Sequence, residues 1–308
     1  MTEAVSSHAA VHDHPRLMRN AAYASLAVSV FLVVIKTFAY FASNSVAVLA
    51  SLMDSALDLF TSSLNMLAIA SALTPADAEH RFGHGKAEPL AGLAQGAFIA
   101  SSATFLTIEA VQRFIEPVAV ARGSIALLVM LVSIAAALGL ALYQRHVVTK
   151  TGSIAVAADN MHYWGDVGTN FGVIVAIVLA AGFKMEAADP VITLIVAAAL
   201  VWSAWSVFRQ SYDQLMDREL PEFDRERIKQ IVRDHTEVRN LHDLRTRASG
   251  IHTFIQFHIE LAPDISLMRA HEISDRVEAE VCAAFPRAEV IIHQDPAGVE
   301  QPPALERS

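Results

Sequence analysis

Two pairs of ionisable residues lie inside apolar stretches that are long enough to cross a membrane. Asp54 and Asp58 are four residues apart in SLMDSALDLF, and His162 and Asp166 are four residues apart in ADNMHYWGDVGTN. Residues at i and i+4 share one face of a helix, so each pair can point in a single direction. A charged side chain at the bilayer centre costs at least about 2.5 kcal/mol, and intramembrane acids usually face a polar cavity.

The two pairs together favour a metal site over chance. If their helices face each other at comparable depth, three carboxylates and one imidazole converge, a set that suits tetrahedral Zn²⁺ and similar divalent ions. Either pair alone could be a chance spacing, a helix cap or a group that reaches the interface. Asp159 and Asn170 extend the polar stripe of the later helix, and Asp159 is also consistent with a cap near the cytoplasmic mouth.

A third group lies in the polar loop TPADAEHRFGHGKAEPL, which follows the earlier of the two helices. Asp77, His80 and His84 have the spacing D-x2-H-x3-H in this glycine-containing segment. Three such ligands and a water molecule would form an open divalent-metal site. A polar turn with incidental histidines has the same sequence, and this alternative stays open.

The last third of the chain carries a fourth group on strand-like segments. His242, His258, His293 and Asp295 fall on the polar sides of three such segments. If the strands are neighbours, these side chains would form one or two further metal sites. Surface histidines on a sheet would give the same pattern.

The composition requires a membrane-spanning part and a soluble part. Of 308 residues, 54% are hydrophobic and 18% are charged, and the mean hydropathy is +0.39. The formal net charge of −9 is concentrated in residues 213–308, where 12 Lys/Arg oppose 19 Asp/Glu, so no basic surface for nucleic acid is predicted. The single cysteine, Cys282, cannot form an intrachain disulfide and is predicted to be a small core residue.

Six apolar segments approach or exceed the roughly 20 residues that cross a bilayer as a helix. They cover residues 17–41, 46–72, 89–115, 124–148, 153–181 and 190–211. Six spans place both termini on one side, and the positive-inside rule assigns that side to the cytoplasm. The flanks on that side carry Arg16, Arg19, Arg81, Lys86, Arg145, Lys150 and Arg209, and the opposite flanks carry Arg113, Arg122 and Lys184. Lys36 in the first span is predicted to extend its ammonium group to the membrane interface.

Residues 213–299 are predicted to form a small α+β domain. A helix after Pro221, strands near 238–250 and 252–262, a helix at 266–285 and a strand at 288–295 give the order αββαβ, one sheet backed by two helices. The remaining predicted parts are a six-helix transmembrane domain at 16–212 and disordered tails at 1–15 and 300–308. The first tail contains His8, His12 and His14, which could bind metal loosely.

Residues 15–299 resemble the cation diffusion facilitators, and in particular the bacterial zinc and ferrous-iron efflux members of that family. The resemblance rests on SLMDSALD, PADAEHRFGHGKAEPLAGLAQ, ADNMHYWGDV, HDLRTRASG, FIQFHIEL and VIIHQDP. It implies a Y-shaped homodimer with a six-helix transmembrane domain. It also implies a ferredoxin-like, metallochaperone-like cytoplasmic domain.

The resemblance also implies roles for individual residues of this chain. Asp54, Asp58, His162 and Asp166 match the transport site of the family, and Asp77, His80 and His84 match its loop site. The cytoplasmic binuclear site maps onto His242, His258, His293 and Asp295, with His271 as a further ligand. Lys86 would pair with Asp217 in a charge interlock of the dimer.

The expected function is proton-coupled efflux of Zn²⁺, with Fe²⁺ or Cd²⁺ as other cargoes, across a bacterial inner membrane. An imidazole with its ordinary pKa near 6.5 can bind metal when neutral and release it when protonated. Metal at the cytoplasmic cluster would regulate transport. A membrane metallohydrolase would need a motif such as H-E-x-x-H, which the sequence lacks, and a metal sensor without transport would have no need of intramembrane acids.

Overall fold

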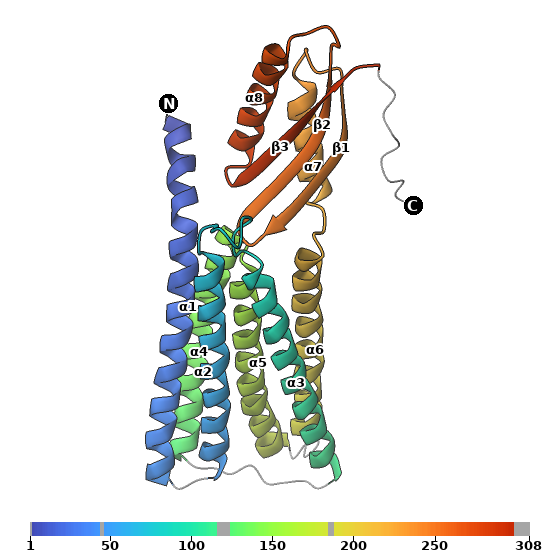
Figure 1. Ribbon diagram of the computed structural model, residues 1–308. Helices are drawn as coiled ribbons and strands as arrows, with labels where there is room; N and C mark the ends of the chain where they lie inside the picture. The colour runs from blue at the N-terminus through green and yellow to red at the C-terminus, as the bar shows by residue number, and fades with distance from the viewer. Residues whose placement is uncertain (1, 44–45, 116–123, 184–187, 299–308) are drawn as a thin grey trace. The chain divides into compact units, whose positions relative to one another are not determined.

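A computed structural model describes residues 2–43, 46–115, 124–183 and 188–298, which divide into two compact units. The first unit, residues 1–212, consists of long helices that lie side by side in a bundle (Figure 1). Its helices are α1 (Thr2–Ser43), α2 (Val46–Ala72), α3 (Ala87–Ile115), α4 (Ser124–Thr151), α5 (Ile154–Phe183) and α6 (Ala188–Leu215), the last of which runs into the second unit.

Four stretches of this bundle are long and apolar enough to cross a membrane, among the residues that the structure describes. They are His14–Ala42, Ala87–Gln112, Leu128–Thr151 and Pro190–Leu215. Helices α2 and α5 have similar lengths, 27 and 30 residues, and carry the acidic pairs. The helical transmembrane domain expected from the sequence is thus confirmed.

Some expectations from the sequence differ from the structure, and others concern residues that the structure does not describe. Helix α1 begins at Thr2 and includes the segment predicted to be a disordered tail, whose Ala and Glu residues favour a helix. The predicted position of the Lys36 ammonium is wrong, because this side chain is only 6% exposed and contacts α2. Arg122, Lys184 and the predicted tail at 300–308 lie outside the described residues.

The second unit, residues 213–308, has the predicted order αββαβ. Its elements are α7 (Glu222–Arg233), β1 (Asn240–Ser249), β2 (His252–Leu261), α8 (Leu267–Ala284) and β3 (Ala288–Pro296). The sheet order is β1-β2-β3, with β2 antiparallel to β1 and parallel to β3. Gly250 has a φ of 58° in the two-residue turn between β1 and β2, a conformation that suits glycine in tight hairpins.

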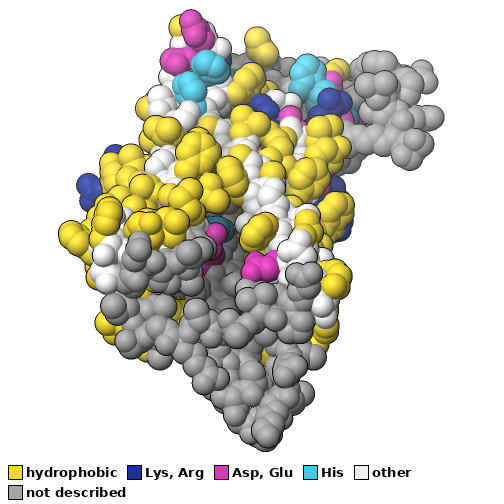
Figure 2. Space-filling view, turned by 90° about the horizontal axis from the view of Figure 1, so that it is seen from below, with side chains coloured by type: hydrophobic (Ala, Val, Ile, Leu, Met, Phe, Trp, Pro, Cys, Tyr) yellow, Lys and Arg dark blue, Asp and Glu magenta, His cyan; other side chains and the backbone are white. Residues whose placement is uncertain are grey.

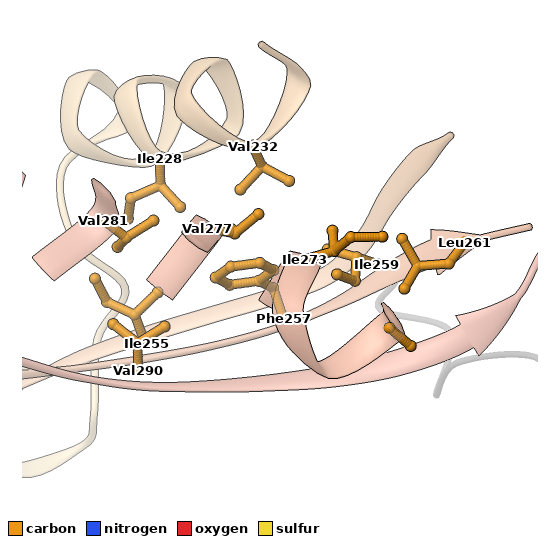
Figure 3. Close-up of a cluster of buried hydrophobic side chains, with 11 residues drawn as sticks. Ile228, Val232, Ile255, Phe257, Ile259, Leu261, Ile273, Val277, Val281 and Val290 are labelled. Atoms are coloured by element: carbon orange, nitrogen blue, oxygen red, sulfur yellow. The ribbon is translucent and has the colours of Figure 1, made fainter. Parts of the chain in front are cut away.

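Both helices of this unit cover the same face of the sheet (Figure 3). Alternate residues of β2, among them Ile255, Phe257 and Ile259, point toward the helices and are at most 1% exposed. They pack against Ile228 of α7 and Val277 of α8 in one hydrophobic core. Burial of each such side chain stabilises the domain by about 1.5–3 kcal/mol, so the sheet is held firmly on this side. Its other face is left to the polar residues.

Cys282 packs against the edge of this core, as predicted from the apolar sequence around it. Burial, together with the charge of Glu278, raises the pKa of its thiol. A thiol with a raised pKa is a weak nucleophile and a poor metal ligand, so Cys282 is a structural residue.

Candidate metal-binding sites

Helices α2 and α5 bring three of the predicted intramembrane ligands together. The Nε2 atom of His162 lies 3.0 Å from Oδ1 of Asp58 and 3.9 Å from Oδ2 of Asp166. The ligand atoms of all three residues lie within 4.8 Å of one another. We call Asp58, His162 and Asp166 the helix cluster. In this arrangement Nε2 can donate its proton to Asp58, so a metal that binds Nε2 must displace that proton.

Asp54 lies one turn before Asp58 on α2 and is not a member of the group of atoms within 4.8 Å. Its carboxylate still interacts electrostatically with Asp58 and His162. Figure 2 views the first unit from the end at which α1 stops and α2 starts, and shows acidic side chains within a hollow. The structure therefore brings three of the four predicted transport ligands together, and the fourth, Asp54, lies one turn from Asp58 on α2.

A set of hydroxyl groups lies directly behind the helix cluster. The Tyr163 hydroxyl is within 2.8 Å of Ser29 Oγ, 3.2 Å of Ser62 Oγ and 3.3 Å of Ser25 Oγ. All four side chains are buried and come from α1, α2 and α5. The sequence analysis missed them because hydroxyl groups scattered through apolar helices carry no periodic signal. They join the three helices next to His162.

Asp159 does not cap α5, so that reading of the sequence is wrong. Its carboxylate is fully buried and accepts hydrogen bonds from Gln95 Nε2 of α3 at 2.9 Å and Gln144 Nε2 of α4 at 2.5 Å. The residue that meets the start of α5 is instead Glu88, which accepts from the Ile154 amide at 3.1 Å. A buried acid with two amide donors fixes three helices together.

The predicted loop ligands also meet. Asp77 Oδ2 lies 3.5 Å from His84 Nε2, Asp77 Oδ1 lies 3.5 Å from His80 Nδ1, and the two imidazole rings are 4.5 Å apart. Hydrogen bonds from the backbone amides of His80 and Glu79 hold the pKa of Asp77 below its usual range. We call Asp77, His80 and His84 the loop cluster. An ionised carboxylate between two imidazoles can accept a divalent ion.

On the open face of the sheet, three histidines form a row across the strands. His242 pairs with His258 in the β1–β2 register, and His258 pairs with His293 in the β2–β3 register. Their ring centroids are 5.0 and 4.6 Å apart, close to the spacing of neighbouring strands. The pairing shifts between His242 and Arg245, where Asp243 has a φ of 48°. This bulge lets His242 stay in the row while the strand continues in a new register.

Asp295 of β3 lies beside this row and contacts all three histidines. Its Oδ2 is 2.9 Å from His258 Nδ1 and 3.3 Å from His242 Nε2, and its Oδ1 is 3.4 Å from His293 Nε2. The pKa of Asp295 lies below its usual range. Partial burial alone would raise this pKa, but the hydrogen bond from His258 and the charges of the neighbouring histidines lower it by more. We call these four residues the sheet cluster. Both ring nitrogens of His242 are buried without a hydrogen bond among the described residues, and each faces a carboxylate oxygen.

Two further residues bear on the sheet cluster, and the sequence analysis named only one of them. Glu260 Oε1 lies 3.6 Å from His242 Nδ1, a neighbour that the sequence analysis missed. His271, which the resemblance assigns to this site, lies on α8 beside Asp275, in the layer that covers the opposite face of the sheet. Its part in metal binding stays a prediction.

The proposed interlock between Lys86 and Asp217 joins residues of the two different units. Asp217 has a φ of 53°, and its Oδ1 is 3.5 Å from Arg247 Nη1 within the second unit. The interlock stays a prediction as well.

The helical bundle and its acid–histidine clusters define a membrane protein that handles divalent cations. Residues 22–216 match the cation efflux transmembrane domain, and residues 220–297 match the cytoplasmic domain of cation efflux proteins. The chain therefore belongs to the cation efflux family, which confirms the resemblance drawn from its motifs. It is a transporter that exports divalent metal cations across a membrane, and its second domain is the dimerisation domain of the family.

Two cation-efflux pumps match the chain over more than nine tenths of its length, and one solved structure matches its second domain. The cation-efflux pump FieF of Cronobacter sakazakii is 41% identical over 288 residues, which cover 94% of this chain and 96% of the relative. FieF of Shewanella oneidensis is 43% identical over 280 residues, 91% of this chain and 94% of the relative. A solved zinc form of CzrB is 31% identical and covers 28% of this chain and 99% of its own, with a TM-score of 0.25.

Proposed function

We propose that this protein exchanges cytoplasmic Zn²⁺ for external protons by alternating access, with Asp54, Asp58, His162 and Asp166 as the transport site. The observation that carries the proposal is the contact between His162 Nε2 and Asp58 Oδ1 at 3.0 Å, made across two helices. One imidazole and three carboxylates suit Zn²⁺ and Cd²⁺ and tolerate Fe²⁺. Asp54 would join the other three ligands when metal draws the carboxylates together.

Competition between metal and protons for the same atoms would provide the coupling. When the cluster faces the cytoplasm, neutral His162 binds the metal. When it opens to a more acidic exterior, protons occupy Nε2 and the carboxylate oxygens, and the metal leaves. Protons that return with the empty site keep it close to neutral inside the membrane, where net charge is costly. The proton gradient would then drive export.

We infer that the sheet cluster is a regulatory site that reads cytoplasmic Zn²⁺. Three imidazoles and Asp295 together offer the four ligands that one tetrahedral ion needs, and His271 would add a fifth in a dimer. Metal there would favour one arrangement of the dimer and alter transport only if its affinity differs between the transport states. The loop cluster would hold metal near the entrance. Both termini would lie in the cytoplasm of a bacterial cell, with the helices in its inner membrane.

The test is metal flux into proteoliposomes under an imposed pH gradient. Zinc uptake should increase with the size of the imposed pH gradient, and it should stop when a protonophore dissipates that gradient. Asp58→Ala should abolish uptake, whereas His146→Ala, which changes an exposed histidine of α4, should leave it unchanged. Full uptake by Asp58→Ala would exclude the helix cluster as the transport site, and uptake indifferent to the gradient would exclude proton exchange.

A further inference from the structure

The Lys36 side chain is a buried cation that none of the proposed steps uses. Its residue is 6% exposed although it belongs to the apolar span His14–Ala42. Its Nζ donates to Ser55 Oγ at 2.7 Å and to the backbone carbonyl of Ser51 at 3.1 Å. Ser55 itself is fully buried. The ammonium is thus fixed to α2 by two hydrogen bonds and is directed into the bundle.

The residues that hold this ammonium alternate with the proposed ligands on α2. Ser51 precedes Asp54 by three residues, and Ser55 precedes Asp58 by three residues, so the acceptors and the acids share one side of the helix. The ammonium interacts electrostatically with the carboxylates of Asp58, Asp54 and Asp166. Lys36 therefore faces the three acids without being one of the ligands.

We propose that Lys36 is a fixed counter-ion that sets the net charge of the transport site to match one divalent cation. This inference rests on the proposed function of the helix cluster. Three ionised carboxylates and a neutral imidazole carry three negative charges, and the ammonium offsets one of them. The two remaining charges equal the charge of one divalent ion, so the loaded site is neutral in the membrane. Without Lys36 the loaded site would keep a negative charge.

A fixed cation near the site also limits how strongly metal is held. The ammonium repels a bound divalent ion, and this repulsion is large where water is scarce. A pump must release its cargo in every cycle, so a weaker site speeds release. Lys36 would act as a positioning residue that tunes affinity through the field on Asp54, Asp58 and Asp166, and not as a ligand.

The test compares Lys36→Gln with Lys36→Arg in the full-length protein. The Gln amide can still donate to Ser55 but carries no charge, whereas Arg keeps the charge. Equilibrium Cd²⁺ binding is measured by calorimetry, and the binding lost in Asp58→Ala is assigned to the helix cluster. Lys36→Gln should bind Cd²⁺ at this site at least about tenfold more tightly, and Lys36→Arg should stay within about threefold of the wild type.

Transport kinetics give a readout that a purely structural role of Lys36 would not produce. In proteoliposomes Lys36→Gln should lower both KM and kcat for Zn²⁺, because a tighter site releases metal more slowly. If the substitution only loosened the contact between α1 and α2, KM would rise, or kcat would fall without a fall in KM. Lys150→Met removes an exposed lysine of α4 and controls for the loss of one positive charge from the protein. If Lys36→Gln aggregates, Lys36→Met takes its place with the same expectations.

The outcomes separate this inference from the proposed function. If Asp58→Ala leaves both Cd²⁺ binding and transport intact, the transport site itself is wrongly assigned. If Asp58→Ala removes one Cd²⁺-binding event, that loss identifies the helix cluster as its site. If Lys36→Gln then binds Cd²⁺ at that site no more tightly than the wild type does, the transport site stands and the role of Lys36 as a counter-ion is excluded. Tighter binding in Lys36→Gln with affinity close to wild type in Lys36→Arg supports the charge of Lys36 as the cause.

Discussion

The helix cluster and the sheet cluster use the same two kinds of side chain but hold them in different ways. The helix cluster joins Asp58 on α2 to His162 and Asp166 on α5, two helices that meet through side chains alone. The sheet cluster takes one histidine from each of three strands whose backbones are hydrogen-bonded in a fixed register. Helices that touch through side chains can rotate or slide, whereas neighbouring strands cannot shift without breaking the ladder.

This difference suits the two clusters to the roles proposed for them, transport for the helix cluster and sensing for the sheet cluster. A transport site must open and close, and helices that can move apart permit that change. A sensing site binds metal more tightly when its ligands are already in place, because less conformational entropy is lost when the metal binds. The hydrophobic core behind the sheet, with Phe257 at its centre, supplies that rigidity.

Removal of the core behind the sheet should have the largest effect. Phe257→Ala should destabilise the second unit by about 3–5 kcal/mol, because it leaves a cavity beneath the histidine row. Urea unfolding of residues 213–298, followed by circular dichroism, measures the loss. Ile291→Ala changes an exposed residue of β3 and should cost far less. Equal losses for both variants would mean that the sheet does not depend on this core.

Loss of the imidazole from the helix cluster should come next. His162→Ala should lower zinc transport on the order of 100-fold, because three carboxylates remain with no neutral ligand to exchange a proton. Zinc binding by the sheet cluster should be unaffected, and paired flux and calorimetry measurements on the full chain test both expectations. If His162→Ala transports zinc at half the wild-type rate or more, His162 is not required for transport by the helix cluster.

Loss of the shared carboxylate of the sheet cluster should have a smaller effect. Asp295→Asn should weaken zinc binding by residues 213–298 about tenfold, because Asp295 contacts all three histidines. Asp275→Asn, beside His271, provides the matched control. Calorimetry measures the affinity, and an unchanged value in Asp295→Asn would mean that the histidine row binds zinc without its acid.

The smallest expected effect concerns an exposed ion pair away from both clusters. Hydrogen bonds from Arg269, with the charge of Arg276, hold the pKa of Glu237 below its usual range. A carboxylate with a lowered folded-state pKa stabilises the domain above its unfolded pKa of about 4.3 and loses that contribution as the pH falls. Glu237→Gln should therefore reduce the decline in Tm of residues 213–298 between pH 6 and pH 3. Identical profiles for both proteins would contradict this.

The sequence predicts the elements and most members of the three side-chain clusters well, because both depend on local periodicity. The i, i+4 spacing of His162 and Asp166 and the alternation in β2 each show which residues share a face. Periodicity does not show which element lies opposite that face. The contact of Lys36 with Ser55 and the two amide donors to Asp159 depend on helix packing, so the sequence predicted an interfacial lysine and a helix cap.

The hydroxyl groups around Tyr163 also bear on how α5 can move. Tyr163 directly follows His162, so a rotation of α5 that turns the imidazole away from Asp58 also moves the phenol relative to Ser25, Ser29 and Ser62. Those contacts carry no net charge, and neither metal nor protons compete for them. If α5 rotates in the proposed transport cycle, the loss of these hydrogen bonds would contribute to the energy barrier a part that depends on neither pH nor metal.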